Sequence, residues 1–361
     1  MLLDYLPLIV PINFSFSANW YFKQSNGRIR YTKDVLLDDP LLKARLALEG
    51  AHLRHDFLPE MFPDPSSTRP SVNLGIGLAT IPHFVYGAIA KYFTYQEPWT
   101  EVLVKPGENP LDVVTAMDES RLEDLYAPLA NQKDALLRQY SPKEISIGPP
   151  DQQGPMNLLF RLVGERIFHY MLKKKDIAHR LFENITTTFI NSHRYFRQLL
   201  HGIRPGKKMP FNVAECCSYL ESPALVEEFN LKYDTRCAEE LGPMGLHSCG
   251  QSTHNLEAFS KFKIIWAEFG FGTDLEKARK LLVQEGIGPV SFSCRINPKR
   301  LLSLQPADIE KDVEYILGAV KGGPASIASV GVDHGTPREN LLAAMNRVKR
   351  YIDEKAELEA C

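Results

Sequence analysis

The chain has 361 residues; 44% are hydrophobic and 24% are charged, and its 42 Lys and Arg nearly balance its 44 Asp and Glu. This composition is typical of a folded globular protein and excludes an intrinsically disordered chain. The formal net charge of -2 lacks the basic excess that phosphate binding requires, so we expect no nucleic-acid partner. The length suits either one large barrel or two smaller domains.

The N-terminal segment MLLDYLPLIVPINFSFSANW is apolar, but Asp4 and two prolines interrupt it and no basic region leads it. We expect neither a signal peptide nor an anchor, and no stretch approaches the ~20 apolar residues of a membrane span. The cysteines all lie beyond residue 215, which does not fit the disulfide scaffold of a short secreted protein. We therefore expect reduced thiols, a cytoplasmic location and no membrane partner.

The first half of the chain is mixed in its predicted elements. Apolar spacing predicts a helix over 41–55, and the Pro- and Ser-rich segment 60–71 is expected to be an exposed loop. Further along, we expect a helix within 110–140, a short strand at 145–148 and a long pair of helices within 157–203.

The second half alternates strand and helix about five times. Predicted strands at 210–214, 242–250, 264–270, 289–298 and 325–333 are separated by predicted helices at 222–241, 253–262, 274–286 and 306–323, and a final helix covers 336–360. This alternation predicts parallel strands with crossover helices. We expect an α/β fold, a (β/α)8 TIM-type barrel forming one domain over 1–361, with inserted helices and an N-terminal extension in 1–70. An open doubly wound sheet is the alternative.

Polar and sulfur-bearing residues stand at the ends of the predicted strands. They are Glu215, Cys216, Cys217, His247, Cys249, Glu268, Cys294, Asp333 and His334. In a β/α barrel the carboxyl ends of the strands meet at one mouth. His247 and Cys249 are two residues apart and point to the same side of an extended segment. Imidazole and thiolate are preferred zinc ligands, and the Glu268 carboxylate could complete the site. Buried core thiols are the commoner interpretation of Cys216, Cys217 and Cys294.

The sequence resembles the uroporphyrinogen decarboxylase superfamily over most of its length, most strongly from about residue 140 onward. The segments that carry the resemblance are IGPPDQQGPMNLLFRLVGERIF, AECCSYLESPALVEEFNLKY, GLHSCGQSTHNLEAF, SCRINPKRLL and GTPRENLLAAM. That superfamily has a β/α barrel and contains both decarboxylases and zinc-dependent methyltransferases that work with corrinoid proteins. The Arg-Gln-Ala-Gly-Arg stretch and late Gly-His-Gly of the decarboxylases are missing here, so the resemblance favours the methyltransferase branch.

The resemblance also implies a ligand set. The methyltransferases carry His-x-Cys-Gly, which matches His247, Cys249 and Gly250, and an acid on the next strand, which matches Glu268. Their last thiolate precedes a Thr-Pro-x-Glu-Asn element, which would place it near Val330, where this chain has no cysteine. We therefore expect Zn²⁺ to be held by His247, Cys249, Glu268 and, as the replacement, Cys294. Asp333, His334 or a water are alternatives to Cys294.

Fewer thiolates leave a harder, more Lewis-acidic zinc, which suits an ether oxygen. We therefore expect transfer of a methyl group from a small methoxylated compound, such as an aromatic one, to the cobalt of a corrinoid protein. The chain lacks the Asp-x-His-x-x-Gly corrinoid motif, so the corrinoid is expected on a separate partner protein.

The expected site extends beyond the metal ligands. The candidate catalytic residues are Glu268 and Asp151, and the candidate substrate contacts are Trp20, Gln152, Gln153 and Asp333. Three other functions stay open: methyl transfer from a methyl-corrinoid to a thiol, decarboxylation, and a barrel that only binds a partner. Relatives are often dimers, so a homodimer is also open.

Overall fold

The computed structural model describes residues 12–360 except 205, 285–287 and 322. Residues 1–11 and Cys361 lie outside the described residues. The prediction that the N-terminal segment is neither a signal peptide nor an anchor falls partly on them. The strands are β1 (Ile12–Phe16), β2 (Ser71–Asn73), β3 (Ala90–Lys91), β4 (Trp99–Thr100), β5 (Ser146–Gly148), β6 (Phe211–Ala214), β7 (Met244–Ser248), β8 (Ile264–Phe269), β9 (Val283–Gln284), β10 (Gly288–Pro289), β11 (Ser291–Arg295) and β12 (Ala325–Val332).

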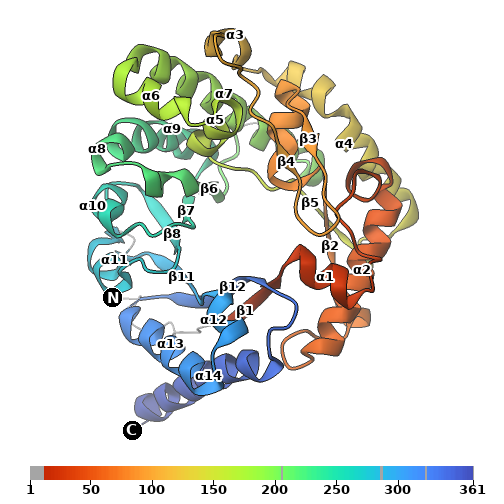
Figure 1. Cartoon of the computed structure of the whole chain (residues 1–361), viewed down its shortest axis with the longest axis vertical. Coiled ribbons are helices and arrows are strands. Elements are labelled where there is room, and N and C mark those ends of the chain that lie inside the picture. The colour runs from red at the N-terminus through yellow and green to blue at the C-terminus, as the bar shows by residue number, and fades with distance from the viewer. Residues whose placement is uncertain (1–11, 205, 285–287, 322, 361) are drawn as a thin grey trace.

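Most strands belong to two parallel arrays. One sheet has six strands in the order β1-β12-β11-β8-β7-β6, and β2 pairs in parallel with β5. Figure 1 shows these strands around a common centre, with the helices outside them. The prediction of an α/β fold with parallel strands is therefore confirmed. Among the described residues, no ladder joins β1 to β2 or β5 to β6, so closure into an eight-stranded barrel stays a prediction.

The helices follow the strands as the alternation predicts. They are α1 (Ala18–Gln24), α2 (Pro40–Phe57), α3 (Pro110–Val113), α4 (Glu119–Gln139), α5 (Pro155–Val163), α6 (Arg166–Lys173), α7 (Lys175–His201), α8 (Pro223–Leu225), α9 (Lys232–Leu241), α10 (Leu256–Phe259), α11 (Leu275–Leu281), α12 (Pro298–Ser303), α13 (Pro306–Ala319) and α14 (Arg338–Ala360). Short 3₁₀ or π-type turns span Asp34–Asp38, Pro65–Ser67, Gly77–Ala79, Ile81–Val85, Cys216–Leu220, Val226–Leu231 and Thr253–Asn255.

Local chemistry explains where these helices begin. Asp118 and Asp274 accept hydrogen bonds from backbone N–H groups in the first turns of α4 and α11, which leaves fewer of those donors unpaired. Proline starts α5, α12 and α13, where its missing N–H costs nothing. The helix predicted over 274–286 ends early at Leu281, because the chain then forms the short antiparallel pair β9–β10.

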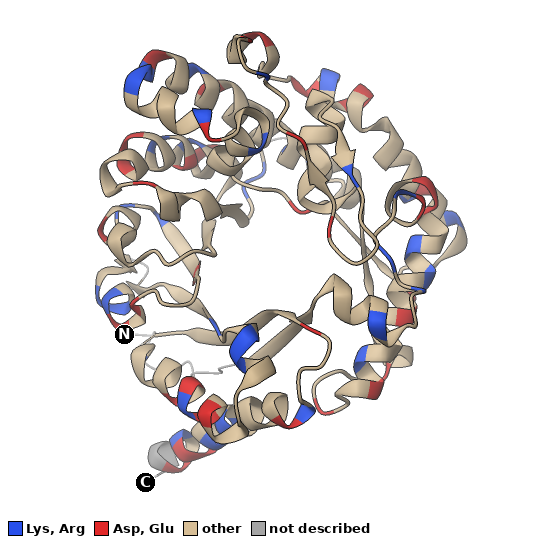
Figure 2. Ribbon diagram, viewed as in Figure 1, with Lys and Arg blue, Asp and Glu red and all other residues tan. Residues whose placement is uncertain are grey.

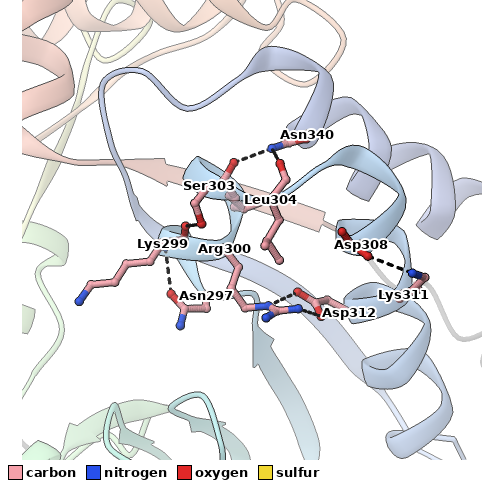
Figure 3. A network of polar contacts seen from close by, with 10 residues as sticks. Asn297, Lys299, Arg300, Ser303, Leu304, Asp308, Lys311, Asp312 and Asn340 are labelled. Carbon is pink, nitrogen blue, oxygen red and sulfur yellow. Dashed lines mark hydrogen bonds and ion pairs between the residues drawn. The ribbon is translucent and has the colours of Figure 1, made fainter.

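The segment that carries the Thr-Pro-x-Glu-Asn element packs against α12. Asn340 is fully buried, and its Nδ2 donates to the carbonyl oxygens of Leu301 and Leu304, each at 2.8 Å (Figure 3). Carbonyls at a helix C-terminus have no partner within the helix, so these bonds satisfy them. Arg300 pairs with Asp312 of α13 at 2.6 Å. These contacts hold α12, α13 and α14 together behind β11 and β12.

Charged residues of both signs lie along the outer helices (Figure 2). This distribution agrees with the nearly balanced composition. Within the described ranges, none of the helices has the length and apolar character that a membrane crossing needs.

Candidate metal centre

Two neighbouring strands bring three metal-binding side chains together. His247 lies on β7, Cys249 follows that strand, and Cys216 follows β6, which pairs with β7 so that Ala214 lies opposite His247. One donor atom from each of Cys216, His247 and Cys249 lies within 4.8 Å of the other two. We call these residues the Cys216–His247–Cys249 group. It stands at the carboxyl ends of the parallel strands, the edge where β/α barrels place their chemistry.

Glu268 fixes the orientation of the His247 ring. It lies opposite His247 on β8, and its Oε2 is 2.7 Å from His247 Nδ1. Its Oε1 accepts a hydrogen bond from Arg295 Nε. With Nδ1 engaged, Nε2 is the ring nitrogen left for a metal, an arrangement common for metal-bound histidines. Glu268 thus contacts the group through His247, and the group of three that could hold an ion does not include it.

The ionisation of the group reflects these contacts. Burial alone would lower the pKa of His247, but hydrogen bonds with Cys216 and Glu268 raise it to about 9. Burial alone would raise the pKa of Glu268, but its bonds with His247 and Arg295 lower it to about 2. The hydrogen bond between the two thiols lowers the pKa of Cys249 to about 7 and, together with burial, raises that of Cys216 to about 12. The thiol of Cys249 is therefore the one closest to its thiolate form near neutral pH.

The donor set fits zinc. Two sulfurs and one imidazole nitrogen at this mutual spacing can surround an ion with bonds of about 2.3 Å to sulfur and about 2.1 Å to nitrogen. Cys249 is exposed to solvent, while Cys216 is half-buried. A three-ligand site with one accessible side leaves a coordination position for a substrate, as catalytic zinc sites do.

Glycine and a buried acid hold Cys216 in place. The Glu215 carboxylate accepts hydrogen bonds from the backbone N–H groups of Met156 (3.2 Å) and Asn157 (3.3 Å) at the start of α5. A Cβ on Gly154 would lie 2.1 Å from Glu215 Oε1, so only glycine permits this close approach. The Gly154 N–H also donates to the Ala214 carbonyl at 2.9 Å, which ties the segment after β5 to the end of β6.

Cys294 lies outside the Cys216–His247–Cys249 group. Successive side chains of a strand point to opposite faces, and on β11 Arg295 points toward Glu268. Cys294 therefore faces the other way, where it is fully buried, and burial raises the pKa of its thiol to about 12. The structure does not bring this expected replacement ligand to the group. Val330, where the resemblance implied a cysteine, lies on β12 beside Ser15 and is 42% exposed.

The remaining expected site residues fall in different surroundings. Asp151 is accessible and near enough to His247 for their charges to interact. Loss of solvation raises its pKa, and His247 partly offsets that effect. Gln153 is buried and accepts a hydrogen bond from Arg161 Nε, while Oε1 of Gln152 is buried without a partner among the described residues.

Two other candidates have structural contacts instead. Trp20 is 1% exposed, and its ring packs 4.1 Å from Phe16 and 5.5 Å from Phe57 (centroid distances). Asp333 Oδ1 accepts hydrogen bonds from Ser17 Oγ at 2.7 Å and Asn19 Nδ2 at 2.9 Å. The structure therefore places Trp20 in the core, and it uses Asp333 to join the ends of β12 and β1.

Comparison with known proteins places the chain in a family. The fold is similar to the solved structure of a methyltransferase from Methanosarcina mazei, with a TM-score of 0.67 and 16% sequence identity, covering 95% of this chain and 94% of that one. Curated protein sequences gave no significant match. The sequence profile of the family "Uroporphyrinogen decarboxylase (URO-D)" matches residues 152–351, more than half of the chain. The chain therefore belongs to the uroporphyrinogen decarboxylase family.

Proposed function

We propose that this protein is a zinc-dependent methyltransferase that moves a methyl group from a small methoxylated compound to the cobalt of a partner corrinoid protein. The observation that carries the proposal is the Cys216–His247–Cys249 group with its oriented imidazole. The family match and the similarity in fold to a methyltransferase support it.

Each residue of the site has a separate role in the proposed reaction. Zinc bound by the group would supply Lewis acidity toward the ether oxygen of the substrate. Glu268 engages Nδ1 of the His247 ring, which leaves Nε2 as the nitrogen available to the metal, and Arg295 holds Glu268. Asp151, whose pKa is raised by loss of solvation, is the acid placed to give a proton to the oxygen that the methyl group leaves. The partner's corrinoid, reduced to Co(I), would supply the electron pair that accepts the methyl group. The C–O bond would break with its electron pair left on oxygen, and Asp151 would give that oxygen its proton.

A second candidate function follows from Cys216. The resemblance implied a site short of one thiolate, whereas the structure places two thiols beside His247. The inference of a harder zinc depended on the missing thiolate, so it no longer separates the two methyl-transfer half-reactions. Two thiolates make a metal more electron-rich, which favours activation of a thiol as nucleophile. Methyl transfer from a methyl-corrinoid to a small thiol is therefore the alternative to test.

One spectroscopic assay separates these functions. The zinc-loaded protein is mixed either with cob(I)alamin and methoxylated donors or with methylcobalamin and thiols, and the corrinoid absorption is followed. We expect methylation of cob(I)alamin that is abolished by a chelator and by Cys249→Ser but retained in Cys217→Ser. Demethylation of methylcobalamin by thiols alone would select the second candidate. Neither reaction, in a protein that holds stoichiometric zinc, would overturn both.

A further inference from the structure

Arg161 is a buried cation that the proposed reaction leaves unexplained. It lies on α5 and is 4% exposed. Its Nε donates to Gln153, and its Nη1 is buried with no hydrogen-bond partner in the part of the chain that the structure describes. Burying a charge is costly unless it is paired, and a native protein rarely leaves a guanidinium nitrogen unsatisfied. This unsatisfied donor therefore points to a partner from outside the chain.

A second unpaired donor lies on the same face of α5. Asn157 is 2% exposed and stands four residues before Arg161, which puts both side chains on one side of the helix. Its Oδ1 accepts the backbone N–H of Cys217 at 2.8 Å, so the amide is anchored next to the metal centre. Its Nδ2 is buried and has no partner among the described residues. Two neighbouring donors, one of them cationic, match the needs of a carboxylate.

The surroundings of Arg161 include both the thiols next to the metal centre and a cavity. The ionisable groups that act on the Arg161 charge are, in decreasing order, Cys217, Cys216, Asp151 and Glu97. On its other side, the Arg161 guanidinium lies 3.7 Å from the ring centroid of Trp99, which is half-exposed. A cavity of about 520 Å³ is lined by residues that include Trp99, Lys105, Phe160, Arg161, Glu165 and Arg166. Its size is in the range of small-molecule sites, and its lining is mainly apolar or basic.

We infer that Arg161 is a specificity-determining residue that binds the carboxylate of a small anionic substrate, with Asn157 Nδ2 as a second donor. The part of this inference that concerns the reaction rests on the proposed function, because it identifies the methyl donor as a methoxylated carboxylic acid. The binding of the anion itself depends only on α5 and its neighbours. A single arginine suits one carboxylate, in contrast to the several that a porphyrinogen carries.

Binding measurements test the inference without any methyl transfer. The zinc-loaded full chain is titrated by calorimetry with methoxyacetate, benzoate and para-methoxybenzoate, and with the neutral amide of each. We expect at least one acid to bind on the order of 10- to 100-fold more tightly than its amide, as a charge-assisted contact provides. Arg161→Met removes the guanidinium, keeps an unbranched apolar side chain and is expected to remove that preference. Arg161→Lys should retain part of it.

Two controls separate this role from other effects. Arg180→Met makes the same change at an exposed arginine of α7 and should leave the preference intact. Zinc content and the melting temperature of Arg161→Met are measured in parallel and should match those of the unchanged protein.

If no acid binds better than its amide, or if Arg161→Met keeps the preference, the inference is overturned. It is also overturned if Arg161→Met loses zinc, because Arg161 would then act on the thiols. Loss of the preference in a protein that transfers no methyl group would leave the anion site standing and reject the proposed reaction.

Discussion

At the residue scale, Glu268 holds the His247 ring, and each of its two carboxylate oxygens has a different partner. One contacts His247 Nδ1 and the other accepts from Arg295. Replacing the carboxylate with an amide in Glu268→Gln removes a charge that both neighbours need. We expect zinc affinity, measured by competition with a chromogenic chelator, to fall about 10- to 100-fold. Glu276→Gln, an exposed acid on α11, is the matched control and should not change it. Unchanged affinity in Glu268→Gln would mean that His247 does not depend on this contact.

Asp151 offers a test at the same scale because its pKa is raised above the ordinary value of a carboxyl group. The proposed proton donor must be protonated, so kcat should fall as pH rises through that raised pKa. Asp151→Asn cannot give up a proton, and we expect its kcat to be lower by about 100-fold or more, with the alkaline fall removed. Zinc content should stay equal to that of the unchanged protein. A rate that falls with pH in the same way in Asp151→Asn would assign the titration to another group.

At the scale of elements, the turn after β8 limits where Cys249 can lie. The Gly270 N–H donates to the Ser248 carbonyl at 2.8 Å, and a Cβ on Gly270 would lie 1.9 Å from the Cys249 carbonyl oxygen. A backbone atom cannot move aside as a flexible side chain can, so Gly270→Ala should displace Cys249. We expect it to lose most bound zinc in elemental analysis and to lower the melting temperature.

A second glycine provides the control for this element. Gly318 lies near the end of α13, and a Cβ there would meet nothing within 4 Å. Alanine is also favoured over glycine in a helix by about 0.5–1 kcal/mol. Gly318→Ala should keep its zinc and melt at the same temperature or slightly higher. Zinc retention in Gly270→Ala would show that the turn does not position the metal ligands.

At the scale of the whole molecule, the first and last strands of the six-stranded sheet in chain order, β1 and β12, are neighbours. β1 pairs with β12, and Asp333 adds side-chain bonds to Ser17 and Asn19 across more than 300 residues of chain. Asp333→Ala leaves these partners without their acceptor, and we expect it to lower the free energy of unfolding by about 1–3 kcal/mol in urea denaturation. Asp353→Ala, at an exposed position on α14, should change it little. Equal stabilities would show that the β1–β12 backbone ladder suffices.

The sequence predicted the parts of this molecule that depend on local pattern. Strand and helix alternation predicted β8, β11 and β12 close to where they lie, and a short separate β-type run predicted β5. The His-x-Cys pair was found because its spacing places both side chains on one side. Cys216 was not chosen as a ligand, because its position depends on β6 pairing with β7 in a register that the local sequence does not contain. A signal was present, however, since Cys216 lies just beyond Glu215 at the end of the strand that precedes the His-x-Cys strand.

Other positions required the third dimension altogether. Cys294 was chosen for its place at a strand end. It is adjacent to Arg295 on β11, so its side chain points to the opposite face of the sheet, away from Glu268. Trp20 was expected to contact substrate, yet it packs with Phe16 and Phe57 in the core. Arg161 has no signal in the sequence, because an unpaired buried donor exists only once the surrounding elements are assembled.

The central claim is that Cys216, His247 and Cys249 together hold zinc, and the adjacent cysteine makes a close control. Zinc per chain is measured by elemental analysis on the unchanged protein and on Cys216→Ser, Cys249→Ser and Cys217→Ser. We predict near-stoichiometric zinc in the unchanged protein and in Cys217→Ser, and strong loss in Cys216→Ser and Cys249→Ser. Equal zinc in Cys216→Ser and Cys217→Ser, or no zinc in the unchanged protein, would contradict the account.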